Sequence, residues 1–114
     1  SVYLYDSLAN DENIKLISRI PSLESLLLGC CAYSDSPLSP KSFQLLQHAK
    51  RLKSLSLFGA VDTLTYDMCL VLYKLKSVET IKVEYCKYDG DGIRLLMKKK
   101  RLILENVEAC GVVK

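Results

Sequence analysis

The sequence has a single histidine, His48, and none of its cysteines are spaced as a C-x-x-C pair. Zinc sites use clusters of cysteine and histidine ligands at short spacings, so this pattern does not indicate a metal site. The cysteine count is odd, which argues against a disulfide framework, and the five residues are Cys30, Cys31, Cys69, Cys86 and Cys110. We therefore expect no metal, no cofactor and reduced thiols, in a reducing intracellular compartment (cytoplasm, nucleus or mitochondrial matrix).

Sequence motifs of common enzymes are also missing. The chain has no G-x-S-x-G elbow, no Walker phosphate loop and no paired-carboxylate arrangement. A cysteine nucleophile needs a base, and His48 is not placed near any thiol by the sequence. The run Asp89-Gly90-Asp91-Gly92 lacks the twelve-residue spacing of a calcium loop, so we interpret it as a turn with Asp91 capping a helix. We expect a protein that is not an enzyme.

Long apolar runs are absent as well. No stretch near 18 residues is continuously apolar, so we expect no membrane span, and no secretory signal opens the chain. The 114 residues fit a single domain, residues 1–114, and 49% of them are hydrophobic, which suffices for a packed core. The net charge of +3 is too small to indicate nucleic acid as the partner on its own.

A repeated apolar pattern runs through the whole chain. Each copy has the form L-x-x-L-x-L followed, after two residues, by a small or sulfur-containing residue. The copies begin 29, 26 and 24 residues apart, at Leu23, Leu52, Val78 and Leu102, and the tail of an earlier copy covers Val2 to Ser7. Cys31, Ala60, Cys86 and Cys110 close the copies in this alignment. The alternation within each copy predicts a short strand with one buried face.

The segments between these strands predict helices. Apolar residues recur nine, six and three positions before the first strand residue of each copy, which places them near one helix face. Ser39-Pro40 predicts a helix start with proline in the first turn, and Thr65 predicts another N-cap. Each copy is therefore expected to form a strand, a turn and a helix.

The strand pattern resembles that of leucine-rich repeats, whose consensus is L-x-x-L-x-L-x-x-N/C. Cys31, Cys86 and Cys110 make it similar to the cysteine-containing subclass found in F-box substrate receptors. The resemblance implies an α/β solenoid of about four repeats, with a parallel β-sheet on the concave side and helices on the convex side. We expect the N-terminal copy to be incomplete, as in a piece of a longer chain.

Residues between the apolar strand positions are expected to point outward, away from the core. In repeat proteins this face commonly binds the partner. Apolar and aromatic residues dominate its N-terminal part and charged residues its C-terminal part, and the predicted partner-binding residues are Tyr3, Tyr5, Leu27, Phe58, Lys82, Glu84 and Asn106. The same alignment points Leu104 and Glu108 outward.

The last copy departs from the pattern in two ways. Lys99 and Glu105 fall in positions that are apolar in the earlier copies, which is typical of a repeat that caps a stack. Lys99 also belongs to the basic run Lys98, Lys99, Lys100 and Arg101. This run fits a charged helix end, where cations suit the helix dipole, and it is also a candidate basic patch for phosphate or nuclear-import contacts.

Together these features favour a non-enzymatic protein–protein interaction module. The resemblance extends this to a substrate-recognition part of a cullin-type, F-box ubiquitin ligase. One alternative is a structural subunit or assembly factor of a large complex, including a mitochondrial one. Another is an RNA-associated adaptor that uses Lys53, Lys82 and the basic run. Protein partners within a larger complex are the favoured expectation, and membrane and nucleic-acid partners are not.

Overall fold

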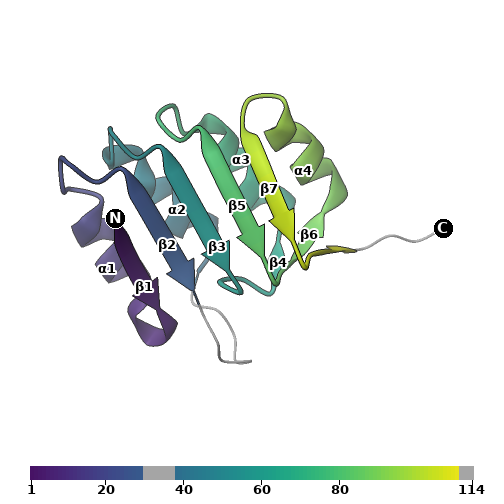
Figure 1. Cartoon of the computed structure of the whole chain (residues 1–114), viewed down its shortest axis with the longest axis horizontal. Helices are drawn as coiled ribbons and strands as arrows, with labels where there is room; N and C mark the ends of the chain where they lie inside the picture. The colour runs from purple at the N-terminus through teal and green to yellow at the C-terminus, as the bar shows by residue number, and fades with distance from the viewer. Residues whose placement is uncertain (30–37, 111–114) are drawn as a thin grey trace.

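A computed structural model describes residues 1–29 and 38–110 of the chain (Figure 1). The fold is mixed α/β, with strands and helices alternating along the sequence. The strands are β1 (Val2–Tyr5), β2 (Ser25–Gly29), β3 (Ser54–Phe58), β4 (Thr63–Leu64), β5 (Thr80–Glu84), β6 (Lys87–Asp89), β7 (Arg101–Glu105) and β8 (Glu108–Cys110). The α-helices are α1 (Asp11–Ile17), α2 (Pro40–Gln44), α3 (Tyr66–Lys74) and α4 (Gly90–Met97). Two 3₁₀ helices complete the list, η1 (Asp6–Leu8) and η2 (Leu45–His48).

Five strands form one parallel sheet in the order β1-β2-β3-β5-β7. Each connection between neighbouring strands passes through a helix, as parallel pairing requires. The short strands form a second parallel sheet in the order β4-β6-β8. In this sheet β4 comes directly before α3 and β6 directly before α4. Every repeat in the C-terminal half therefore contains a strand of each sheet, followed in two of the three cases by a helix.

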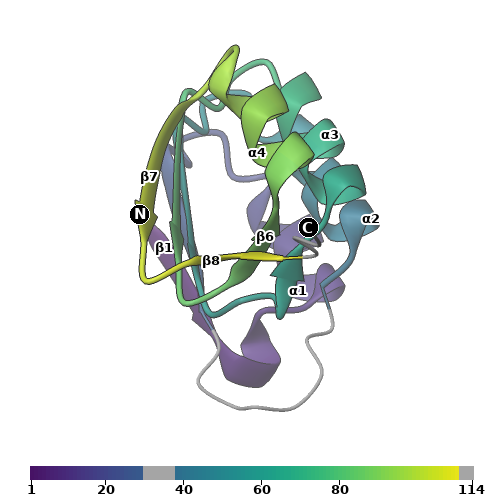
Figure 2. The same ribbon diagram turned by 90° about the vertical axis from the view of Figure 1, so that its right-hand side faces the viewer.

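All four α-helices lie on one side of the five-stranded sheet, as Figure 2 shows in side view. The core fills the space between the sheet and these helices. Two rows of side chains run across the sheet in register, one through Leu26, Leu55, Ile81 and Leu102 and the other through Leu28, Leu57, Val83 and Leu104. Helix residues such as Ile14, Phe43, Leu72 and Leu96 cover these rows and are fully buried. Burial of these apolar side chains is the main favourable contribution to folding.

The helices begin at polar residues whose side chains cap free backbone amides. Asn10 caps α1 and Thr65 caps α3, each accepting a hydrogen bond from the amide three residues later. The predicted start at Ser39-Pro40 is confirmed. The predicted cap Asp91 is wrong, because Asp89 caps α4 by accepting from the amide of Gly92 at 2.9 Å. Helix α4 therefore begins two residues earlier than the sequence pattern indicates.

Strand pairing corrects the alignment of the last repeat. Ile81 pairs with Leu102 and Val83 with Leu104, so Leu102 is the second apolar residue of its copy rather than the first. The aligned copy runs from Lys99 through Leu102 and Leu104 to Val107. The physical reason is a shorter connection: the loop from α4 to β7 has three residues, Lys98 to Lys100, whereas five residues separate α3 from β5. Aligning the copies by their apolar period cannot detect this loss of loop residues, because the spacing of apolar residues within the helix is unchanged.

This correction changes three predictions. Glu105 does not occupy a core position; it lies beside Glu84 on the outward face. Leu104 is half-buried and points inward, so it is not an outward residue. Val107, not Cys110, holds the closing position shared with Ala60 and Cys86. The polar substitution that marked the last copy as a cap is thus Lys99 alone, and Val107 stands where the sequence alignment placed a cysteine.

Candidate interaction surface

The face of the five-stranded sheet that points away from the helices is termed the open sheet face. Its residues alternate with the buried rows and form three lines across the strands. The middle line contains Tyr3, Leu27, Ser56, Lys82 and Ile103. The line at the carboxyl ends of the strands contains Tyr5, Gly29, Phe58, Glu84 and Glu105. Six of the seven predicted binding residues therefore share this one face.

Aromatic side chains gather where the strands of the sheet end. Phe58 and Tyr85 stand edge to face, with ring centroids 5.1 Å apart and an angle of 64° between their planes. Tyr3 and Tyr5 are exposed on β1. Such exposed rings carry a large apolar area together with hydroxyl groups, which is the composition of protein-binding hot spots.

Gly29 makes room for the ring of Tyr5. A β-carbon on Gly29 would come within 2.7 Å of two ring carbons of Tyr5 and within 3.4 Å of a methyl of Leu27. The ring therefore lies along the open sheet face, across the neighbouring strand, instead of extending into solvent. The missing side chain at Gly29 and the ring of Tyr5 together create a continuous aromatic surface over β1 and β2.

Tyr85 was not predicted from the sequence as a surface residue. It directly follows β5 and has a positive φ of 57°, a conformation that non-glycine residues rarely adopt. Strand pairing aligns it with Asp6, Gly59 and Asn106, which have φ values of 54°, 58° and 51°. Strands β1, β3, β5 and β7 thus end in the same left-handed turn. Gly59 was a sequence signal for this turn. Tyr85 adopts the same turn, which places its ring over Phe58.

Asn106 occupies this turn and not the open sheet face, so its prediction as an outward strand residue is wrong. The register shift in the last repeat is the cause. Glu108 likewise lies in β8 of the second sheet. The outward residues of the last strand are Arg101, Ile103 and Glu105.

Charged side chains occupy the C-terminal part of the open sheet face. The ammonium group of Lys82 lies 3.4 Å from a carboxylate oxygen of Glu84 and 3.6 Å from one of Glu105. The hydrogen bond that Lys82 donates to Glu84, and then the negative charge of Glu105, raise the pKa of Lys82. The arrangement leaves one excess negative charge beside the aromatic cluster, so it favours a partner with a cationic group next to an apolar one.

The basic run does not form one patch. Lys98, Lys99 and Arg101 are exposed, but Lys100 is buried and donates hydrogen bonds to the carbonyl oxygens of Leu75 and Val78, at 2.6 Å for the second. The ammonium of Lys99 lies 4.5 Å from the centre of the Tyr73 ring, a cation–π contact. Burial and the neighbouring charge of Lys99 lower the pKa of Lys100. Lys100 therefore has a packing role and leaves three members of the run at the surface.

The thiols of Cys69 and Cys86 are buried. Burial and the charge of Asp89 raise the pKa of Cys69 to about 12. Burial also raises the pKa of Cys86, although amides of the Gly59–Val61 turn partly offset this by pointing at its sulfur. Neither thiol has the lowered pKa of a nucleophile. Cys30, Cys31 and the side chain of Cys110 lie outside the described part of the structure.

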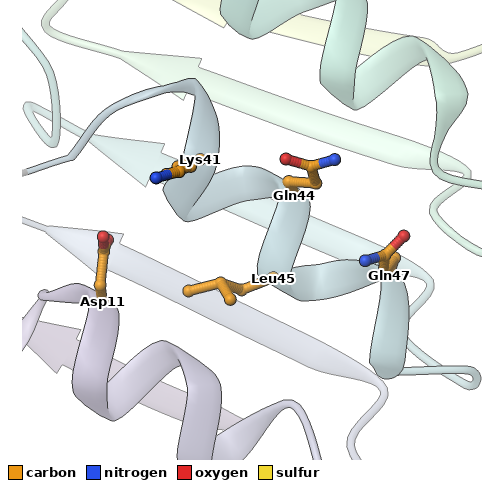
Figure 3. A pocket seen from close by; sticks show the side chains of 5 residues that line it. All are labelled: Asp11, Lys41, Gln44, Leu45 and Gln47. Atoms are coloured by element: carbon orange, nitrogen blue, oxygen red, sulfur yellow. The ribbon is translucent and has the colours of Figure 1, made fainter.

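A shallow hollow of about 240 Å³ lies between α1 and α2 (Figure 3). It is lined by Asp11, Lys41, Gln44, Leu45 and Gln47. Asp11 accepts a hydrogen bond from the buried hydroxyl of Ser42, so its carboxylate links the two helices. The hollow has no nucleophile next to a base, and within residues 1–29 and 38–110 no cluster of three metal-ligating side chains is found. In the same ranges no helix is long and apolar enough to cross a membrane.

No protein-family model matches the chain, and neither a curated protein nor a solved structure does so.

Proposed function

We propose that the chain is a short leucine-rich-repeat solenoid that binds a protein partner through its open sheet face, without enzymatic activity. The strand–turn–helix order, the parallel sheet and the shared left-handed turn support the repeat assignment. Each repeat buries its apolar side chains against the next one, which is how such repeats are stabilised.

The observation that carries the proposal is the aromatic cluster of Tyr3, Tyr5, Phe58 and Tyr85. Exposed fractions of 64%, 46%, 38% and 57% leave much of each ring in contact with water. Tyr3 and Tyr5 on β1 share one face with the Phe58–Tyr85 pair at the ends of β3 and β5. Exposed aromatic side chains of this kind are typical of protein-binding surfaces. The rigid sheet beneath the rings holds them in place, so little conformational entropy is lost on binding.

The resemblance to F-box receptors suggests that this partner is a substrate of a ubiquitin ligase. A receptor of that type would hold its client on the open sheet face while another segment docks to the ligase. The expected client surface combines an apolar group for the cluster around Phe58 with a basic group for Glu84 and Glu105.

The test is affinity purification from the native source with quantitative mass spectrometry. A Tyr3→Ala, Phe58→Ala, Tyr85→Ala variant is compared with wild type and with a Leu8→Ala, Leu16→Ala, Met97→Ala control. The control residues are equally exposed apolar side chains away from the open sheet face. We expect partners, including ligase components, whose client fraction is lost in the first variant and kept in the control. A fixed set of subunits unchanged by the first variant would contradict the proposal and support a structural subunit.

A further inference from the structure

A second surface lies along the edge of the molecule where the helices end and the strands of the large sheet begin. It is formed by residues 18–24, 49–53, 74–79 and 98–101, and is termed the helix-end rim. Figure 1 shows these connections side by side along the upper edge of the sheet. The rim lies where the strands begin, and Arg101 is the one residue that it shares with the open sheet face.

The helix-end rim concentrates the positive charge of the chain. It holds ten of the sixteen lysine and arginine residues but only two of the thirteen acidic residues, Glu24 and Glu79. Its net charge is therefore +8, and the rest of the chain has a net charge of −5. The overall charge of +3 conceals this separation because the two regions nearly cancel.

Backbone hydrogen bonds hold neighbouring rim segments together. The amide of Ser54 donates to Glu24 at 3.1 Å, the amide of Glu79 to Lys53 at 2.8 Å and the amide of Arg101 to Glu79 at 2.9 Å. These bonds extend the sheet ladder into the loops. Apart from the buried Lys100, the cations are thus presented in a line on a fixed frame, with each segment contributing in turn.

Three rim lysines surround a hollow of about 300 Å³. Lys50, Lys74 and Lys76 line it together with Gln47, Leu75 and Ser77. The three lysines are exposed, and no acidic side chain lines the hollow. An anionic group in the hollow would lie among three lysine side chains and the amide of Gln47, which are donors that bind phosphate oxygens. The hydroxyl of Ser77 already donates to the carbonyl oxygen of Ala49 at 3.1 Å.

Helix dipoles explain only part of this pattern. A cation stabilises a helix when it lies within the last turn, as Lys74 does in α3. Arg51, Lys53, Lys76 and Arg101 lie beyond the helices that precede them, where the dipole has little effect. The placement of these residues therefore calls for an external anion.

We propose that the helix-end rim binds the phosphodiester backbone of a nucleic acid, with a phosphate group in the lysine hollow. A line of cations matches a linear polyanion, and lysine, a point charge, suits contacts that do not depend on sequence. An anionic membrane is less well matched, because Ile20 is the one large apolar side chain that the rim exposes for insertion. A nucleic-acid duplex carries about one charge per 1.7 Å, roughly twice the density of an extended protein segment in which every residue is acidic.

The test measures binding of a fluorescently labelled 20-nucleotide polyuridine RNA, with a DNA duplex as a second probe, by anisotropy at 50 and 200 mM salt. A Lys50→Gln, Lys74→Gln, Lys76→Gln variant is compared with a Lys15→Gln, Lys41→Gln, Lys87→Gln control, which changes the net charge equally. Circular dichroism checks that both variants fold. We expect the rim variant to bind at least tenfold more weakly and the control to stay within twofold. The slope of log affinity against log salt should fall by about 2 for single-stranded RNA, from three lost phosphate contacts.

Three results would overturn the proposal. The first is absence of binding to either nucleic acid at 50 mM salt. The second is an equally large loss of nucleic-acid affinity in both variants, which would show that binding depends on net charge alone. The third is stronger binding to phosphatidylserine vesicles or to polyglutamate than to either nucleic acid, which would assign the rim to a membrane or to an acidic protein.

Discussion

The sulfur of Cys69 in α3 lies 2.7 Å from the point that a β-carbon on Gly92 would occupy in α4. The backbone of Tyr66 is 3.3 Å from the same point. Gly92 is thus a place where α3 and α4 approach closely, and glycine is required there for space and not for an unusual φ. Neighbouring repeats are joined at this contact.

Gly92→Ala is expected to destabilise the protein by roughly 1–3 kcal/mol, because the added methyl overpacks the contact with Cys69. Gly90→Ala in the same helix is the matched control. Its β-carbon would meet only the guanidinium of Arg94 at 3.7 Å, an ordinary contact. The control should be neutral or slightly stabilising, because alanine lowers the entropy of the unfolded chain. Urea unfolding measures both, and equal stabilities would show that the helices do not pack as described.

Lys100→Ala is expected to cost about 1–3 kcal/mol, because it leaves the buried carbonyls of Leu75 and Val78 without their donor. Lys98→Ala, at an exposed neighbouring position, should stay within about 0.5 kcal/mol of wild type. Urea midpoints of the two variants test this difference. A Lys100→Ala variant as stable as the Lys98→Ala variant would mean that the ammonium group lies in solvent.

The thiol of Cys69 should make stability fall at high pH. Its pKa is raised from 9.0 to about 12, so the unfolded chain loses this proton from about pH 9 upward while the folded chain keeps it. Below pH 9 both states keep the proton and the thiol contributes no pH dependence. Between pH 9 and 10 the loss is roughly 1 kcal/mol, and a Cys69→Ala variant should lack it. Parallel pH–stability curves for wild type and variant would contradict the burial of this thiol.

The strand register of the last repeat can be tested by paired substitutions. Leu104→Ser should destabilise the protein by at least about 1 kcal/mol, because this side chain packs against the core. Glu105→Ser should have little effect, since Glu105 is exposed. Thermal unfolding distinguishes this register from the periodic one, in which Glu105 faces the core and Leu104 the solvent. If Glu105→Ser destabilised the protein more than Leu104→Ser, the periodic alignment would be the correct one.

The strands of the first three full copies and most outward residues could be predicted from sequence, because the alternation of apolar residues shows which side chains of a strand are buried. Tyr3, Tyr5, Leu27, Phe58, Lys82 and Glu84 all follow from that alternation. The last copy could not be placed, because shortening the loop before β7 moves the strand without changing the helix. Lys100 was misjudged for a related reason: a charge run in the sequence does not reveal which ammonium group turns inward to backbone carbonyls.

The position of Tyr85 in the aromatic cluster and the separation of charge could not be predicted from the sequence, for another reason. Tyr85 joins the aromatic cluster through a left-handed turn that only strand pairing identifies as common to Asp6, Gly59 and Asn106. The helix-end rim is assembled from four segments far apart in the chain. Counting charges over the whole sequence cannot show that one edge holds most of the cations.

Site-specific photo-crosslinking tests the central claim, partner binding by the open sheet face, most directly. A benzophenone amino acid replaces Tyr85 in one variant and Leu16 in another, both of which are exposed at 57% and 62%. After irradiation in extract from the native source, we predict a crosslinked partner band from position 85 that Tyr3→Ala and Phe58→Ala abolish, and no such band from position 16. A band from position 16 with none from position 85 would contradict the account and place the partner on the helical side.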